Sequence, residues 1–508
     1  VSHGMRREDA KALANAARES IEVKPDLENG DGFGAALAAW MPAHQRDNGF
    51  EPIREEEARR AHAYAMRTAE ADTNDATFQA MEALVHNLNT MNSRAGAQVP
   101  FSSINYGTDT SPEARMVIRN LLLATEDGLG DGETPIFPVQ IFKVKEGVNF
   151  NPGDPNYDLF RLAIKTSAKR LFPNFSFLDA PFNLQYYKPG DYNTEVAYMG
   201  CRTRVMGNVY DPDREVTCGR GNLSFTSINL PRIAIEAKGD LNAFFRMLDD
   251  RMDLVVRQLL HRFQIQCGKK VYNYPFLMGQ GVWIDSDKLG PDESVEEVLR
   301  HGTLSVGFIG LAETLKALTG KHHGESEESQ KLGLKIIGHM RDRMDEESRK
   351  RRLNFTLLAT PAEGLSGRFL RMDQKKYGKL PGITDRDYYT NSFHVPVYYP
   401  ISAFKKIELE APYHALTNAG HISYVELDGD VCRNLDAFES VVRWMKQCGV
   451  GYGSVNHPVD RDPVCGYTGV IDDVCPRCGR REGEGVSVEK LRELRKKFPS
   501  MPQFVGLE

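Results

Sequence analysis

Three cysteines near the C-terminal end of the sequence have the spacing of a metal-binding knuckle. In Cys475-Pro-Arg-Cys478-Gly the two thiols are separated by two residues, so both can bind one tetrahedral ion. Cys465 precedes Cys475 with nine residues between them and can supply a third thiolate. Asp462, with two residues between it and Cys465, stands where a paired knuckle has its fourth cysteine, and a carboxylate can also bind zinc. The pattern predicts a zinc site of three cysteines and one aspartate.

Other interpretations of this segment remain open. His457 and Asp460 are alternative fourth ligands, and a metal-free turn with free thiols is the competing structural explanation. The phrase "VCGYTG" also resembles the loop that carries a backbone radical in glycyl-radical enzymes. Accessible thiols quench such a radical, so Gly466 and Gly469, inside a cysteine-lined turn, are not expected to hold one.

A second cysteine of interest is Cys201, in "YMGCRTRV". It lies between a β-prone run and a loop rich in Gly, Asp and Arg, where a side chain can be presented at a loop tip. The S–H bond of a thiol is weak, so the sulfur can become a thiyl radical that takes hydrogen from carbon. Taken alone, a cysteine beside an apolar strand is more often a small core residue. Cys218, further along the same region, is interpreted as an incidental loop thiol.

The stretch "ATPAEGLSGRF", residues 359–369, has small residues and Ser366 in front of a helical run. Free backbone N–H groups at the start of that helix could hold a phosphate. An ordinary capped helix explains the pattern about as well.

The elements that must position these residues follow from hydrophobic periodicity. Residues 5 to about 98 have the composition and apolar spacing of helices, and from about 99 to 440 strand-like and helix-like segments alternate. The alternation favours an α/β fold with a large sheet or barrel. Beyond residue 450 the composition turns to Gly, Pro, Asp and Cys, which indicates a small separate module, and "VSVEKLRELRKKFPS" predicts one short charged helix.

Composition excludes several classes of protein. The 64 basic and 70 acidic residues among 508 give a formal charge of -6 without a basic block, so nucleic acid is not an expected partner. No apolar run approaches the ~18 residues of a membrane span, and no signal core is present. Eight cysteines in so long a chain fit a reducing cytoplasm better than a disulfide framework.

Long phrases between about residues 80 and 482 resemble one known family, the catalytic subunits of the anaerobic, class III ribonucleotide reductases, which are glycyl-radical enzymes. The phrases are "NLNTMNSRAGAQVPFSSINYGTDTS", "TPIFPVQIFK", "FLDAPFN", "YMGCRTRV", "GRGNLSFTSINLPRIA", "ATPAEGLSGRF", "YYTNSFHVPV" and "GYGSVNHPVD".

The resemblance implies a fold and an organisation. The fold would be a ten-stranded α/β barrel of two five-stranded halves, with a finger loop in its lumen and a small C-terminal zinc ribbon. The corresponding division is a helical region at 1–80, the barrel at 81–448, the zinc-ribbon module at 449–482 and a helical tail at 483–508.

The resemblance also implies site residues. Cys201 would be the thiyl-radical residue that takes the 3′-hydrogen of a ribonucleotide, and Asn222 would lie near the ribose hydroxyls. The substrate-binding residues would be Ser102, Ser103, Thr360, Glu363, Gly364 and Ser366. The effector-binding residues would be Arg202, Arg204 and Arg220.

The cofactors and partners implied are those of the family. The substrates would be ribonucleoside triphosphates, formate would be the reductant, and dNTP or ATP effectors would set substrate choice. A radical-SAM activase would install the glycyl radical, and the enzyme would be a homodimer.

The sequence departs from the family pattern in three places. No Arg-Val-Cys-Gly-Tyr-like phrase follows the knuckle, so the 508 residues alone are expected to be inactive. The N-terminal region looks abbreviated, without a second redox cysteine or an evident ATP cone, which favours formate over a dithiol reductant. Asp462 replaces a cysteine. Two alternatives therefore stay open: a non-catalytic or split-enzyme nucleotide-binding barrel, and a glycyl-radical lyase that acts on a non-nucleotide substrate.

Overall fold

The computed structural model describes residues 6–22, 30–47, 55–91, 98–462, 464–471, 473–481 and 483–497. The chain forms two compact units. The first contains Val1–Asn87 and Asp109–Asp127, and the second contains Leu88–Thr108 and Gly128–Glu508. The earlier division at residues 80, 448 and 482 stays a prediction.

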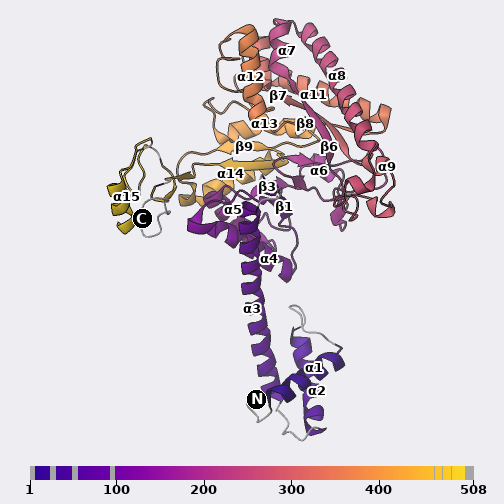
Figure 1. The fold of residues 1–508 in the computed structure, drawn as a ribbon, viewed down its shortest axis with the longest axis vertical. Helices are drawn as coiled ribbons and strands as arrows, with labels where there is room; N and C mark the ends of the chain where they lie inside the picture. Colours follow the sequence, from indigo (N-terminus) through magenta and orange to yellow (C-terminus); the bar gives the residue numbers. More distant parts are fainter. Residues whose placement is uncertain are drawn as a thin grey trace. The chain divides into compact units, whose positions relative to one another are not determined.

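The first unit is helical in its described parts. Its helices are α1 (Arg7–Ser20), α2 (Gly30–Asp47), most of α3 (Glu55–Thr90) and α4 (Pro112–Asp127) (Figure 1). Asn120 on α4 donates a hydrogen bond to Asn74 Oδ1 on α3 at 3.0 Å, which joins these two helices through polar side chains.

The second unit contains a five-stranded sheet in the order β1-β2-β3-β10-β9. The strands are β1 (Ser103–Tyr106), β2 (Val139–Val144), β3 (Asn174–Phe177), β9 (Ser423–Glu426) and β10 (Tyr452–Asn456). β1, β2 and β3 run parallel, and β10 is antiparallel to β3 but parallel to β9. Helices α5 (Tyr157–Arg170), α13 (Ala403–Leu416) and α14 (Leu435–Gln447) pack against it.

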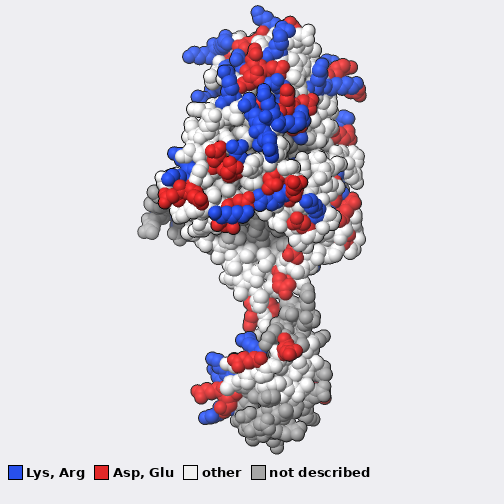
Figure 2. All heavy atoms as spheres, turned by 90° about the vertical axis from the view of Figure 1, so that its right-hand side faces the viewer, with Lys and Arg blue, Asp and Glu red and all other residues white. Residues whose placement is uncertain are grey.

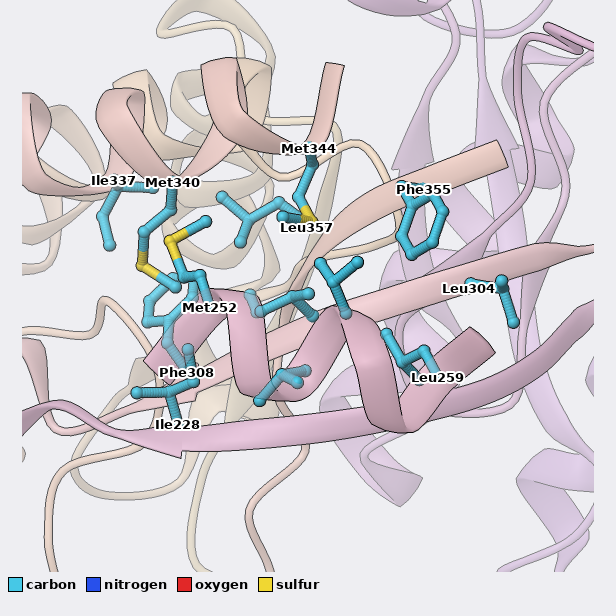
Figure 3. Packing of buried hydrophobic residues seen from close by; sticks show 14 of the residues in the cluster. Ile228, Met252, Leu259, Leu304, Phe308, Ile337, Met340, Met344, Phe355 and Leu357 are labelled. Atoms are coloured by element: carbon cyan, nitrogen blue, oxygen red, sulfur yellow. The ribbon is translucent and has the colours of Figure 1, made fainter. Parts of the chain in front are cut away.

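A second sheet has three parallel strands, β6 (Asn222–Asn229), β7 (Thr303–Ile309) and β8 (Asn354–Ala359). Every residue of β7 and β8 is buried, as expected of parallel strands covered on both faces. The crossover helices are α7 (Leu230–Ala237), α8 (Leu241–Cys267), α10 (Leu311–Thr319) and α11 (Glu327–Arg351). Figure 3 shows Phe308 of β7 close to Met252 of α8 and Met340 of α11 in the core of this layer.

A short hairpin, β4 (Tyr198–Met199) and β5 (Thr203–Arg204), connects the two sheets, and Cys201 lies in its turn. The segment 419–421 lies between this hairpin and β8. Gly420 pairs with Thr203 on one side and Leu358 on the other. A Cβ at Gly420, where φ is +139°, would lie 2.2 Å from the Arg202 carbonyl oxygen, so only glycine permits this approach.

The α/β class is confirmed, and one sheet has the five strands expected of a half-barrel. The described residues of the second sheet form three strands. The segment beside β8 pairs with it through an isolated bridge between Leu358 and Gly420, so this segment is not a fourth strand. The C-terminal part contains β11 (Asp460–Arg461), β12 (Thr468–Gly469) and α15 (Val488–Lys497). Elsewhere the chain adds α12 (Gly364–Tyr377) after β8, and short α6 (Pro181–Leu184) and α9 (Glu296–Leu299).

Among the described helices, none is both long and apolar enough to cross a membrane. Figure 2 shows acidic and basic side chains side by side on the face that it draws, in keeping with the near balance of 64 basic and 70 acidic residues.

Truncation of the β7 core residue Phe308 to Ala should lower the free energy of unfolding by about 3–5 kcal/mol, because the fully buried ring leaves a cavity among side chains from α8 and α11. Urea unfolding followed by circular dichroism measures this change. The matched control is Phe276→Ala, whose ring is 65% exposed and whose loss should change stability by less than about 0.5 kcal/mol. Equal effects of the two changes would contradict the assignment of the core.

Candidate active site and metal centre

The turn that carries Cys201 is held on one side by β1. The Gly200 N–H donates to Ser103 Oγ at 3.0 Å. The Asn105 side chain accepts from the Tyr198 N–H at 3.1 Å and donates to the Tyr198 carbonyl at 2.8 Å. These bonds fix the backbone on the N-terminal side of the cysteine.

The other side of the turn is held by the end of β8. The Arg202 guanidinium donates to the carbonyls of Ala359 and Thr360, each at 3.3 Å, and the Arg202 carbonyl accepts from the His421 N–H at 3.2 Å. Cys201 itself is half-buried. The structure therefore carries this thiol at a hairpin tip between the two sheets and not on an outer face.

Two tyrosines of the first sheet lie close to the thiol. Burial is the main cause that raises the pKa of Tyr424 and of Tyr452, and the Cys201 thiol adds to the rise in both. Both phenols are therefore neutral at physiological pH. The Arg202 guanidinium lies 5.8 Å from the centre of the Tyr424 ring.

A buried aromatic and histidine cluster supports the hairpin. The Tyr198 ring stacks on Tyr452 with centroids 4.4 Å apart, and its hydroxyl lies 2.8 Å from His421 Nε2. Burial lowers the pKa of His421 well below its usual value, so the imidazole is neutral and can accept this hydrogen bond. Sequence analysis missed these residues, because no spacing pattern connects Tyr198 with residues more than 200 positions later.

A cavity of about 640 Å³ lies beside this arrangement and shares Tyr424 with it. Its lining also includes Glu363 and Ser366 at the start of α12, His394, Lys406 from α13, and residues 385–391, which carry acidic, basic, aromatic and neutral polar side chains. The predicted phosphate-binding segment thus forms part of a cavity wall near the β4–β5 hairpin.

The start of α12 has an unusual backbone. Glu363 precedes the helix with φ +42° and ψ −132°, and Ser366 Oγ donates to the Glu363 carbonyl at 2.8 Å. Gly364 is the first residue of the helix. Thr360 Oγ1 lies 2.8 Å from Ser227 Oγ, a contact across β7 that requires Gly307, since a Cβ there would lie 2.1 Å from Thr360 Oγ1.

The remaining predicted substrate residues lie in different places. Ser103 Oγ accepts the hydrogen bond from Gly200 in the turn that carries Cys201, and Ser102 Oγ donates to the Pro100 carbonyl at 3.4 Å. Asn222 begins β6, and its side chain donates to Thr303 Oγ1 at 3.0 Å and to Ser305 Oγ. Asn222 is five residues, or about 16 Å along the strand, from Ser227, which contacts Thr360. The structure does not bring Asn222 into contact with the start of α12.

The three predicted effector arginines are buried, each 5% exposed or less. Arg204 donates to Asn183 Oδ1 at 2.7 Å and to the Phe182 carbonyl at 3.3 Å. Arg220 donates to the carbonyls of His301, Val216 and Gly207. With Arg202 bound to β8 carbonyls, all three guanidinium groups hydrogen-bond within the fold, and the effector contacts stay a prediction.

The cysteine knuckle forms as expected. Ligand atoms of Asp462, Cys465, Cys475 and Cys478 all lie within 4.8 Å of one another. The sulfurs of Cys465 and Cys475 are 3.6 Å apart, and Cys478 Sγ is 3.5 Å from Asp462 Oδ2. Tetrahedral zinc with Zn–S bonds of ~2.3 Å and Zn–O bonds of ~2.1 Å has S–S separations of about 3.8 Å and S–O separations of about 3.6 Å. The donor set and its spacing fit zinc.

Asp462 is well prepared to be the fourth ligand. Burial would raise its pKa, but hydrogen bonds from the backbone of Cys465 and Val464 and from Arg480 outweigh burial and hold the pKa below its usual value. The alternative ligands are engaged elsewhere. His457 Nε2 lies 3.1 Å from the Ser167 carbonyl, and Asp460 Oδ2 accepts from the Ile471 N–H at 2.9 Å.

A family model described as anaerobic ribonucleoside-triphosphate reductase matches residues 33–491. The chain belongs to this reductase family. The reductase-family protein of Salmonella typhimurium is 36% identical over 439 residues, which cover 85% of this chain and 59% of that protein. The corresponding protein of enterobacteria phage T4 is 35% identical over 432 residues, which cover 83% of this chain and 68% of that one. The chain thus spans about three fifths of the length of the Salmonella protein.

Solved structures show a similar fold. The anaerobic ribonucleotide reductase from Thermotoga maritima with dATP bound in the specificity site superimposes with a TM-score of 0.55 at 16% identity, covering 80% of this chain and 65% of that one. The B12-independent glycerol dehydratase from Clostridium butyricum gives a TM-score of 0.53 at 10% identity, covering 88% and 71%. At such low sequence identity, the structural similarity shows that the folds are alike and shows nothing about function.

In this reductase-family chain, Cys475→Ser should abolish zinc binding, which we expect at about one ion per wild-type chain, because a buried tetrahedral site loses affinity when one thiolate is removed. Elemental analysis of the purified protein measures the zinc content. Cys267→Ser is the control and should retain the metal, since Cys267 lies on α8, outside the knuckle. Wild-type protein without any zinc would refute the site.

Proposed function

We propose that the protein reduces ribonucleoside triphosphates to 2′-deoxyribonucleoside triphosphates, with Cys201 as the thiyl-radical residue. The observation that carries this proposal is the position of Cys201, half-buried at a hairpin tip between two sheets, near Tyr424, which lines a cavity of about 640 Å³. The names of the relatives, which are anaerobic ribonucleoside-triphosphate reductases, support the same reaction.

The reaction explains why a cysteine occupies this position. Removal of the ribose 2′-hydroxyl requires a carbon radical at C3′, which ordinary acid–base side chains do not generate. The Cys201 sulfur radical would take the 3′-hydrogen, so that an S–H bond forms as the C3′–H bond breaks. The hydrogen bonds of Gly200 and Arg202 hold the backbone on both sides of Cys201 in place, which favours one near-attack geometry.

Substrate placement follows from the cavity. We place the phosphates at the start of α12, with Thr360, Glu363, Gly364 and Ser366, and the sugar toward the fingertip. Ser102 and Ser103 at the start of β1 and Asn222 on β6 are proposed as further contacts. For Asn222 this requires a substrate that reaches the first residues of β6, where the side chain now binds Thr303 and Ser305.

The remaining requirements are proposals taken from the family. A glycyl segment outside these 508 residues, charged by a radical-SAM activase, would supply the radical, and formate would supply the reducing equivalents. dNTP or ATP effectors would act near Arg202, Arg204 and Arg220 in a homodimer located in the cytoplasm. The two sheets would belong to a ten-stranded barrel around the finger, and zinc, when bound, would hold the knuckle turns together.

Cys201→Ala should reduce the formation of deoxyribonucleotide to the background of the assay while nucleotide affinity changes less than about twofold, because the change removes the reacting sulfur and leaves the cavity wall intact. Product formation is measured under anaerobic conditions with formate, a glycyl segment and the activase, and affinity is measured by calorimetry.

The matched control is Cys218→Ser, an exposed thiol that contacts Asn193 and should retain activity. Reduction that survives Cys201→Ala would reject the assignment. Nucleotide binding without reduction in the activated wild-type protein would instead favour a non-catalytic binding role.

A further inference from the structure

His394 is a buried side chain of the cavity wall with one nitrogen unused. It is 5% exposed and lines the 640 Å³ cavity. Its Nδ1 lies 3.1 Å from Glu410 Oε2, whereas its Nε2 has no hydrogen-bond partner within the described part of the chain. Buried polar atoms are rarely left without a partner, so each such atom needs an explanation.

Glu410 determines how the imidazole is oriented. The carboxylate is fully buried on α13 behind the cavity wall, and its Oε1 accepts from the Val395 N–H at 3.0 Å. Burial would raise its pKa, but its interactions with His394 and Lys406 outweigh burial and hold the pKa at about 2. An ionised Glu410 can only accept, so His394 Nδ1 carries the hydrogen between them. Nε2 is then the atom left for a ligand.

The backbone around His394 is strained on both sides of the cavity. Ser392, two residues earlier, has φ +39°, and Glu363 on the facing segment has φ +42°. The Ala362 N–H donates to Asn391 Oδ1 at 3.1 Å and so joins the two segments. Ser392 Oγ is also buried without a partner among the described residues. Strain in non-glycine residues that the surrounding structure maintains is common at ligand sites.

We propose that His394 Nε2, as part of an imidazolium, donates a hydrogen bond to an anionic oxygen of a ligand in this cavity. The inference rests on the proposed function for the nature of that ligand. Two sources share this chemistry, a phosphate of the nucleotide and the carboxylate of formate. The binding step takes one proton from solvent onto Nε2 and forms an N–H···O bond, and no covalent bond or electron transfer is involved.

Charged groups face His394 from several elements. Lys406, which lines the cavity, and the buried Glu410 come from α13. The other charged groups of the lining are Glu363, which precedes α12, Asp385, Arg386 and Asp387 of the segment before His394, and Glu426 of β9; Tyr388, Tyr389, Tyr398 and Tyr424 are the titratable phenols. Carboxylates outnumber cations in this set and repel a free polyanion, so the anion must be held by local donors such as His394.

The test is calorimetric titration of the full chain at pH 8, where a nucleotide γ-phosphate is already ionised. CTP with Mg²⁺ and sodium formate are titrated separately, each in two buffers of different ionisation enthalpy, which gives the number of protons taken up. We expect His394→Gln to weaken binding of one of the two ligands by about 10- to 100-fold, the usual loss of a hydrogen bond to a charged group. When the ligand binds, the wild-type protein should also take up as much as one proton more per chain than the variant does.

The matched control is His339→Gln. His339 also pairs with a carboxylate, at 2.8 Å from Asp249 Oδ1, but it lies on α11 and does not line the cavity. Its replacement should change neither the affinity nor the proton uptake. If His394→Gln does not fold, protection of His394 from diethyl pyrocarbonate by each ligand in the wild-type protein, with His339 unprotected, replaces the variant.

The outcomes separate the two proposals. Loss with CTP alone assigns the anion to a phosphate, and loss with formate alone assigns it to the carboxylate. Binding of either ligand by the wild-type protein, with unchanged affinity and proton uptake in His394→Gln, overturns this inference and leaves the proposed function intact. Wild-type protein that binds neither ligand would overturn both.

Discussion

The geometry of the site depends on the backbone of one short hairpin being held from two directions. β1 binds the main chain at Gly200, and the end of β8 accepts the side chain of Arg202. A single hydrogen bond contributes only about 1 kcal/mol, but a buried donor that loses its partner costs more. Movement of the tip would leave several such donors unpaired at once. The position of Cys201 is therefore fixed by the two sheets and not by its own turn.

Close packing around the hairpin depends on two glycines. Gly420 lets the segment beside β8 reach the Arg202 carbonyl, and Gly307 lets Thr360 meet Ser227 across β7. Any side chain at either position would overlap with backbone or with a hydroxyl group. These contacts join the end of β8 to the β4–β5 hairpin on one side and to β6 on the other.

Sequence analysis identified what local spacing encodes. The knuckle depends on four residues within 17 positions, and its predicted ligands do come together. The strand segments and the start of α12 were equally visible, because periodicity and small residues are local signals. The roles of Arg204 and His394 could not be predicted from local signals. Arg204 pairs with Asn183 and His394 pairs with Glu410, and only tertiary folding brings these partners together. An arginine in a Gly-rich loop looks like an anion-binding group until its burial is known.

The candidate metal site shows how an aspartate can stand in for a cysteine in such a motif. An aspartate in place of a cysteine keeps the formal charge of a four-thiolate site, but its second oxygen and its rotation must be controlled. At Asp462 the backbone N–H groups of Val464 and Cys465 hold Oδ1, and Arg480 approaches Oδ2 at 3.1 Å. Such partners fix the orientation of a ligand and maintain its ionised form. Oδ2 lies 3.5 Å from the Cys478 sulfur, so the orientation that these bonds impose places an oxygen where it could serve as the fourth ligand of a bound zinc ion.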